Sequence, residues 1–149
     1  MLEENPIQSV QESSGAVCKQ TEDIVELDTS LTKDVKLGPL SLTAITLNWG
    51  RNRISDCEWR ETYLNLYNDG RYEGNVNLRC NKGAFFTCTL ATSFKIYVGQ
   101  TVVAVLDAPT KEVAGADDKN AGLSGFSRAI ADYFDQITSA GRVQDPRNC

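Results

Sequence analysis

Residues 61–80, ETYLNLYNDGRYEGNVNLRC, decide the fold class of this chain. Asn68-Asp69-Gly70 in the middle is a strong hairpin signal, because these residue types tolerate the positive φ angles of a tight β-turn. After the turn, polar and mostly apolar residues alternate with the period of a half-buried strand. The stretch therefore predicts an antiparallel β-hairpin with one dry face. That face carries Tyr72, Gly74, Val76, Leu78 and Cys80, and the opposite face carries Arg71, Glu73, Asn75, Asn77 and Arg79.

Further strands are predicted on both sides of the hairpin. Residues 45–49 alternate in the same way, and residues 24–42 suit one or two short strands with a turn at Gly38-Pro39. A turn at residues 81–83 leads into a long strand over 86–98. Gly99-Gln100 then turns the chain into the valine-rich residues 101–106, which predict a central strand buried on both faces. Because the short turns leave no room for parallel crossovers, we expect a mainly β fold, an antiparallel meander that forms a sandwich or a small barrel.

The C-terminal part has a different pattern. Residues 110–125 are polar and predict a long loop. Phe126, Ile130 and Ile137 then recur at helical spacing and predict one amphipathic helix, with Ser127 as its N-cap and Gly141 as its C-terminal stop. Residues 1–20 are polar and predict a flexible arm, which leaves residues 21–149 as a single β-rich domain.

Composition and charge narrow the range of functions. The chain has 149 residues, of which 41% are hydrophobic and 23% charged, and its net charge is −5. Such an acidic balance repels a phosphate backbone and argues against nucleic-acid binding. No segment approaches the roughly 20 apolar residues that span a bilayer. The first residues, MLEENP, do not resemble a signal peptide, so the protein is secreted or periplasmic if a leader was removed and cytoplasmic otherwise.

Cysteine is frequent and histidine is absent. Without histidine, the Ser-His-Asp and Cys-His mechanisms and the histidine-containing zinc sites are excluded. No phosphate-binding or dinucleotide-binding motif is present, so no cofactor and no metal is predicted. Two disulfides with Cys18 as the leftover thiol are favoured over five reduced, buried cysteines. The candidates for the two disulfides are Cys57, Cys80, Cys88 and Cys149.

A weak resemblance supports an extracellular setting. From Trp49 onward the chain resembles small secreted bacterial β-domains of unknown function. The residues that carry this likeness are Trp49, Asp56-Cys57-Glu58-Trp59, Leu64 and Leu66 before Asp69-Gly70, Phe134-Asp135-Gln136-Ile137 and Cys149. The resemblance implies a disulfide between Cys57 and Cys149, and it implies no activity.

Aromatic and basic residues gather around the hairpin. Trp59, Tyr63 and Tyr67 lie near Arg71 and Arg79, a combination typical of surfaces that grip a sugar or a protein. The competing interpretation is that the aromatic residues are core and the arginines solvate the outer face. We expect a binding module of a secreted or cell-surface system, with a protein or glycan partner. The sequence makes no prediction of the oligomeric state.

Three other functions remain open. The acidity suits an immunity or inhibitor protein that neutralises a basic target. A barrel that encloses a small apolar ligand is a second alternative. The third is a carboxylate-dependent hydrolase, which is less favoured than a binding role because two carboxyl groups must converge. Its candidates are Asp56, Glu58 and Glu61, with Asp69 or Asp107 as a partner.

Overall fold

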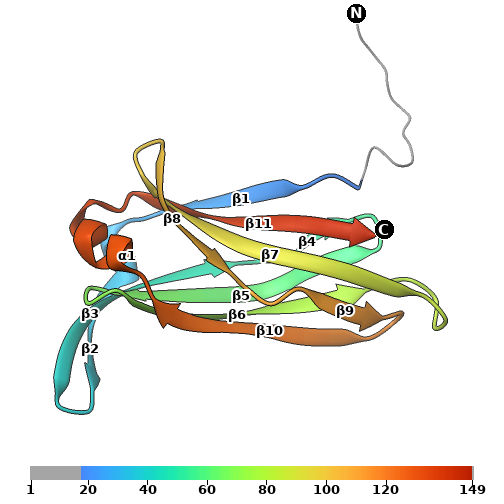
Figure 1. Ribbon diagram of the computed structural model, residues 1–149, viewed down its shortest axis with the longest axis horizontal. Helices are drawn as coiled ribbons and strands as arrows, with labels where there is room; N and C mark the ends of the chain where they lie inside the picture. The colour runs from blue at the N-terminus through green and yellow to red at the C-terminus, as the bar shows by residue number, and fades with distance from the viewer. Residues whose placement is uncertain (1–17, 149) are drawn as a thin grey trace, which may run out of the picture.

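The computed structural model describes residues 18–148, which form two antiparallel sheets packed face to face as a sandwich (Figure 1). One sheet has the order β1-β11-β7-β8, with β9 also paired to β7, and the other has the order β10-β6-β5-β3-β2, with β4 paired to β5. The elements are β1 (Thr21–Glu26), the 3-10 turn η2 (Thr29–Leu31), β2 (Thr32–Leu37), β3 (Leu40–Trp49), β4 (Asn52–Ile54), β5 (Cys57–Tyr67), β6 (Arg71–Cys80), β7 (Thr87–Val98), β8 (Thr101–Asp107), β9 (Lys111–Ala114), β10 (Asp118–Phe126), α1 (Arg128–Tyr133), η3 (Phe134–Gln136) and β11 (Ser139–Asn148).

The mainly β, antiparallel prediction is confirmed, and so is the hairpin at its centre. β5 and β6 pair across the predicted turn, and Val76 and Leu78 are fully buried. Gly70 has a φ of 99° and packs tightly, because a Cβ there would lie 2.6 Å from the carbonyl oxygen of Ser127. The flexible arm predicted for residues 1–20 falls almost entirely outside the described residues, as does Cys149.

The chain does not continue as one meander after the hairpin. β6 pairs with β5 and β10, whereas β7 pairs with β11, β8 and β9 in the other sheet. The predicted turn at residues 81–83 therefore carries the chain from one sheet to the other. A disulfide between Cys80 and Cys88, with 5.5 Å between the two Cα atoms, closes this connection.

The prediction that residues 101–106 form a central strand buried on both faces is wrong. β8 is the last strand of its sheet, and Val102 and Val105 are 40% and 54% exposed. Valine-rich composition reports β-propensity, whereas the position of a strand in its sheet depends on which partners the rest of the chain supplies.

The prediction of a long loop over residues 110–125 is also wrong. β9 and β10 occupy most of this segment. β10 pairs with β6 along its whole length and contributes only Ala121 and Leu123 to the buried core. Its other residues are polar or glycine apart from the exposed Phe126 at its end, so the strand carries little hydrophobic signal, and its pairing with β6 stabilises it.

The predicted helix is present but short. Ser127 is its N-cap, since the Ser127 hydroxyl accepts a hydrogen bond from the backbone N–H of Ile130 over 3.3 Å. The helical segment ends with η3 at Gln136, not at Gly141, which lies inside β11. β11 is an interior strand between β1 and β7 that the sequence did not predict. Among the described residues, no helix is long and apolar enough to cross a membrane.

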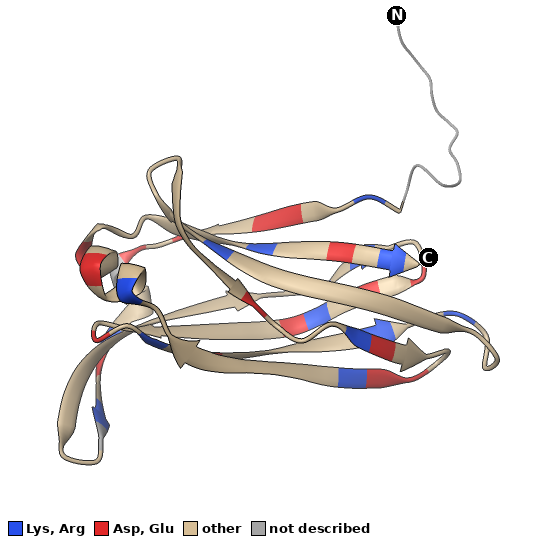
Figure 2. Ribbon diagram, in the orientation of Figure 1, with Lys and Arg blue, Asp and Glu red and all other residues tan. Residues whose placement is uncertain are grey.

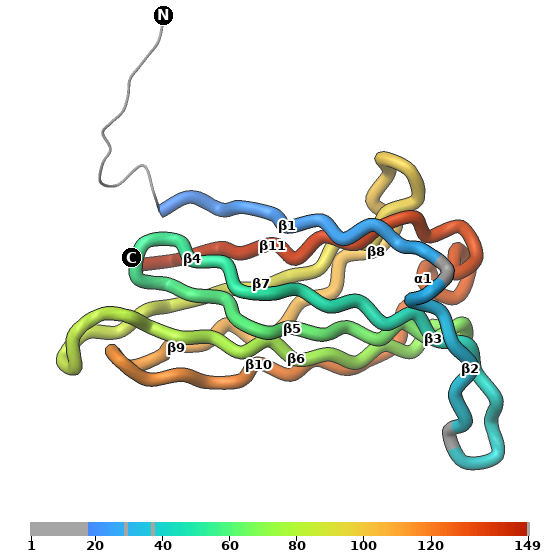
Figure 3. The backbone as a smooth tube through the Cα atoms, turned by 180° about the vertical axis from the view of Figure 1, so that it is seen from behind, coloured from blue at the N-terminus to red at the C-terminus, as the bar shows by residue number. Residues whose placement is uncertain are grey.

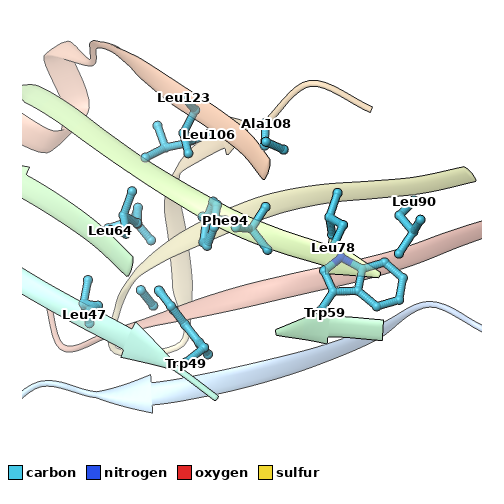
Figure 4. Close-up of a cluster of buried hydrophobic side chains, with 14 of the residues drawn as sticks. Leu47, Trp49, Trp59, Leu64, Leu78, Leu90, Phe94, Leu106, Ala108 and Leu123 are labelled. Carbon is cyan, nitrogen blue, oxygen red and sulfur yellow. The ribbon is translucent and has the colours of Figure 1, made fainter. Parts of the chain in front are cut away.

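The core lies between the two sheets (Figure 4). Trp49 of β3 packs against Phe94 of β7, with ring centroids 5.3 Å apart. Trp59 of β5 is fully buried, and its indole Nε1–H donates to the hydroxyl of Thr92 over 2.8 Å. Each sheet thus presents its large apolar side chains to the other sheet, and a smaller apolar cluster of Leu42, Ala44 and Tyr67 lies apart from this core.

The cysteine assignments need correction. Cys57 is the free cysteine of the described residues and is buried, whereas Cys18, predicted as the leftover thiol, is disulfide-bonded. Cys57 therefore does not form the disulfide with Cys149 that the resemblance implies. Cys57 lies opposite Cys80 in the register of the hairpin, but Cys80 is bonded to Cys88, and Cys57 stays a buried thiol.

Candidate functional site

Five asparagine side chains share the outer face of the six-stranded sheet. Each alternates along its strand with residues that face the core, so the amides point to solvent. All of β3, and β10 beyond its first two residues, are uncharged (Figure 2). The charged side chains of this face therefore come mainly from β5 and β6. The five residues are Asn48 on β3, Asn65 on β5, Asn75 and Asn77 on β6, and Asn120 on β10.

A depression of about 710 Å³ lies in the middle of this face. Four of the amides, all except Asn65, line it together with Tyr63 and Glu61. Two smaller hollows adjoin it, one of about 420 Å³ reaching Tyr67 and one of about 390 Å³ reaching Arg60. The strands β3, β5 and β6 lie side by side (Figure 3), and the three hollows follow one another along β5.

Tyr63 stands at the centre of the depression. In the register of the sheet, Tyr63 pairs with Asn48 on β3 and with Asn75 on β6, so the phenol ring has an amide on either side. The tyrosine is 41% exposed. With a strand spacing of about 4.8 Å, the two amides stand roughly 10 Å apart across the ring. An aromatic ring between two amides offers an apolar surface flanked by hydrogen-bond donors and acceptors.

The amides of β6 and β10 hold one another in place. Nδ2 of Asn75 and Nδ2 of Asn77 each donate to Oδ1 of Asn120 over 3.1 Å. Oδ1 of both β6 residues and Nδ2 of Asn120 make no hydrogen bond with another described residue. This side of the depression therefore presents oriented amide groups that retain donors and acceptors for a ligand.

The hollow near Tyr67 rests on a hydrogen-bonded chain. Thr46 donates its hydroxyl to Oδ1 of Asn65 over 2.8 Å, and Nδ2 of Asn65 donates to a carboxylate oxygen of Glu73 over 3.3 Å. Tyr67 donates its phenol hydroxyl to the same oxygen over 3.1 Å. Burial and this hydrogen bond both raise the pKa of Tyr67. Tyr67 is only 7% exposed, so it supports the hollow from beneath.

A β-bulge in β5 shapes the opposite side of the depression. Between Trp59 and Thr62 the register shifts, so that Arg60 and Glu61 stand opposite the single residue Asn77 of β6. Bulges of this kind break the alternation of side chains and re-aim one of them. Here the bulge gives Glu61 a place in the lining of both the central depression and the smaller hollow beside Arg60.

Arg142 of the other sheet holds this bulge from below. Its guanidinium Nη1 donates to the carbonyl of Arg60 over 2.9 Å and to the hydroxyl of Thr62 over 2.7 Å. Nη2 donates to the carbonyl of Gly50 over 2.8 Å and to a carboxylate oxygen of Asp23 over 3.2 Å. Arg142 is 1% exposed, and burial lowers its pKa while Asp23 opposes that effect. The floor of the depression is therefore tied to the second sheet.

The predicted binding residues divide into three groups. Tyr63 lies in the depression and Tyr67 under the adjoining hollow. The prediction that Trp59 belongs to an exposed platform is wrong, because its large apolar ring is enclosed between the sheets. Arg71 and Arg79 share the outer face of β6 but stand near opposite ends of the strand. Neither lines the depression, and Arg71 forms an ion pair with Asp69 over 3.0 Å.

The amides were the part of the site that sequence reasoning missed. The alternation of residues 71–80 places Asn75 and Asn77 on the solvent face. The repeated asparagine at these two positions is the one local signal for an amide cluster on that face. Asn48 and Asn120 reach the same depression only through strand pairing, and Asn120 lies 45 residues from Asn75 in the chain. No local pattern contains that information.

The candidate carboxylates of the hydrolase alternative are not gathered in the depression, which only Glu61 lines. Glu58 is paired with Arg51 over 2.7 Å. Asp56 and Asp69 flank opposite ends of the 11-residue strand β5, roughly 35 Å apart at about 3.3 Å per residue. Asp107 belongs to β8 of the other sheet. The depression therefore does not bring a second of these carboxylates beside Glu61, as the two-carboxylate arrangement of glycosidases would require.

No protein-family model and no curated protein matches this chain. The physical arrangement of the depression is therefore the basis for a functional proposal.

Proposed function

We propose that this protein is a glycan-binding module that holds a sugar chain on the asparagine–tyrosine face of its six-stranded sheet. The observation that carries the proposal is the exposed ring of Tyr63 between the amides of Asn48 and Asn75, inside a depression of about 710 Å³. A pyranose ring has an apolar C–H face and a rim of hydroxyl groups. The phenol ring of Tyr63 can stack on the apolar C–H face, and the amides can hydrogen-bond the hydroxyl groups.

The chemistry of the amides favours a hydroxyl-rich ligand over an apolar one. A side-chain amide both donates and accepts hydrogen bonds, as a sugar hydroxyl does, so each amide can bind a hydroxyl group in either sense. The mutual hydrogen bonds of Asn75, Asn77 and Asn120 reduce the side-chain freedom that binding would otherwise remove. An open, shallow and polar depression also suits a polymer that extends beyond the site, because the chain ends need no enclosed cavity.

Secretion is the second part of the proposal. The Cys80–Cys88 disulfide is compatible with an oxidising compartment, where disulfides form and persist. Polysaccharides of cell walls and cell surfaces lie in the same compartments. The proposal thus joins an extracellular location to an extracellular class of ligand.

The experiment that tests the proposal compares two tyrosines of equal exposure. Tyr63 and Tyr133 are both 41% exposed, but Tyr133 lies on α1 and does not line the depression. The parent protein, Tyr63→Ala and Tyr133→Ala are measured by affinity electrophoresis on a panel of neutral polysaccharides and by calorimetry on soluble oligomers of any that bind. We expect Tyr63→Ala to weaken binding about tenfold or more and Tyr133→Ala to leave it unchanged.

Thermal melting serves as the control for folding. Because Tyr63 is exposed and outside the core, Tyr63→Ala should melt close to the parent. Retention of full affinity by Tyr63→Ala would refute the assignment of the site. Failure of the parent protein to bind any glycan, neutral or amine-bearing, would refute the glycan class.

A further inference from the structure

Glu61 is the only acidic residue in the lining of the central depression and of the hollow beside Arg60. Two guanidinium groups also line that hollow, those of Arg51 and Arg60, and both are already paired. Arg51 lies 2.7 Å from a carboxylate oxygen of Glu58, and Arg60 lies 3.3 Å from one of Asp118. Glu61 itself forms no ion pair with another described residue, so the central depression and the hollow beside Arg60 carry one uncompensated negative charge.

The backbone around Glu61 is held by hydrogen bonds on both sides. The carbonyl of Arg60 accepts from Nη1 of Arg142 and from the Thr62 hydroxyl, the latter over 2.9 Å. The Thr62 hydroxyl accepts from the same guanidinium nitrogen. These contacts fix the residues before and after Glu61 to a buried side chain of the opposite sheet. The bulge therefore keeps the carboxylate in the depression, whereas regular alternation would not place Arg60 and Glu61 opposite a single residue.

The charge of this carboxylate disfavours anionic ligands and favours cationic ones. An anionic sugar, such as a uronate, would bring a second negative charge beside Glu61 and into the field of a chain with a net charge of −5. A protonated amine would instead supply the missing counter-charge and three N–H donors. Neutral sugars fall between these extremes, since their hydroxyl groups donate to the carboxylate without any change in charge.

We infer that Glu61 sets the charge preference of the glycan site, so that it binds glycans with free amino groups more tightly than acetylated ones and excludes anionic ones. This inference rests on the proposed glycan-binding function and assigns its ligand class. Glu61 is solvent-exposed, so the preference for the amine is modest, about fivefold at low salt. It weakens as salt rises, because the screening length falls to about 3 Å at 1 M.

The probes are glucosamine oligomers, their fully N-acetylated counterparts of equal length and galacturonate oligomers. Binding is measured by calorimetry at about pH 5.5, where the sugar amine is protonated. The variant Glu61→Gln keeps the size of the side chain and one acceptor oxygen, replaces the other oxygen by an NH2 donor and removes the charge. Glu26→Gln is the matched control, because Glu26 is exposed on β1 of the other sheet and is also without an ion pair to a described residue.

We expect the parent and Glu26→Gln to prefer the amine-bearing oligomer about fivefold at low salt, and Glu61→Gln to bind both neutral and amine-bearing oligomers equally. Equal affinities of the parent for both oligomers would overturn the inference and leave the glycan-binding proposal standing. A preference retained by Glu61→Gln, or lost equally in Glu26→Gln, would also overturn it. If the parent protein binds none of the three probes and no neutral polysaccharide, the proposed function is refuted, and the inference falls with it.

Discussion

Asp23→Ala is the substitution whose effect on stability follows most directly from the structure. Asp23 is the carboxylate that compensates the buried guanidinium of Arg142, at 3.2 Å. The same carboxylate oxygen also accepts from Nε2 of Gln144 over 2.9 Å, and Gln144 is fully buried. Removing the carboxylate leaves a buried cation without its counter-charge and a buried amide N–H without its acceptor.

The magnitude has two parts. Loss of one partner of a buried ion pair costs about 3–5 kcal/mol, but the side chain of Asp23 is 44% exposed, so water partly replaces the carboxylate and about 2 kcal/mol is the appropriate figure. The lost hydrogen bond from Gln144 adds about 1 kcal/mol. We therefore expect a loss of about 3 kcal/mol in the free energy of unfolding. With a urea m-value of about 1.5 kcal/mol/M, the midpoint should fall by about 2 M.

The assay is equilibrium unfolding in urea, followed by the fluorescence of Trp49 and Trp59. The cycle is completed by Arg142→Met and by the double variant. Because Arg142→Met removes the charge that Asp23 compensates, the double variant should lose at least about 1 kcal/mol less than the sum of the two single variants.

The matched control is the surface ion pair between Arg128 and Asp132, whose side chains are 83% and 56% exposed. Asp132→Ala should change stability by less than about 0.5 kcal/mol. If Asp23→Ala costs no more than this control, or if Asp23→Ala and Arg142→Met are additive, the guanidinium does not depend on Asp23 and the reasoning is refuted.

Three further predictions concern the interior. Burial raises the pKa of Cys57 to about 11, from an ordinary value of 9.0, so the folded protein favours the protonated thiol. The contribution of this thiol to the free energy of unfolding is therefore fully present below pH 9.0 and is lost as the pH rises through about 11. The urea midpoint of the parent should therefore fall more steeply than that of Cys57→Ser over this range, and equal slopes would contradict the assignment. Cys88→Ser opens the disulfide to Cys80 and should cost about 2–3 kcal/mol, seen as a melting temperature lower by about 5–10 °C; an unchanged melting temperature would count against a closed disulfide in the native protein. Thr92→Val leaves the indole N–H of Trp59 buried without an acceptor and should cost about 1–3 kcal/mol in urea unfolding, whereas a loss below about 0.5 kcal/mol would mean that water reaches the indole.

The parts of the fold that the sequence predicted correctly are those with local causes. The β5–β6 hairpin follows from a turn of three residues that tolerate positive φ and from strict alternation after it. The N-cap Ser127 follows from its position just before a helical pattern. In each case the residues that specify the structure are neighbours in the chain.

The strands that were missed depend on distant partners. β11 contains glycine, proline and charged residues, yet it lies between β1 and β7. Arg142 finds hydrogen-bond partners across the sandwich on β5, and Gln144 finds its partner on the neighbouring strand β1. Asp23, which serves both, lies 119 residues from Arg142. A local sequence pattern cannot predict a buried arginine, since the free-energy cost of burying its charge depends on the groups that surround it.

The candidate site shows the same division. Alternation places Asn75 and Asn77 on the solvent face of β6, and Tyr63 is among the aromatic residues predicted to bind a ligand at the hairpin. Nothing in the sequence indicated that Asn48 and Asn120 would join them or that a bulge would add Glu61.

Taken alone, the amino-acid order determined that this chain forms antiparallel strands, where one tight turn falls and which side of β6 is dry, because turn chemistry and side-chain alternation act between near neighbours. Only the tertiary structure decided which strands lie in which sheet, and hence which polar side chains meet at the depression. Strand pairing is a choice among distant segments, made by the burial and hydrogen bonding of the whole chain at once.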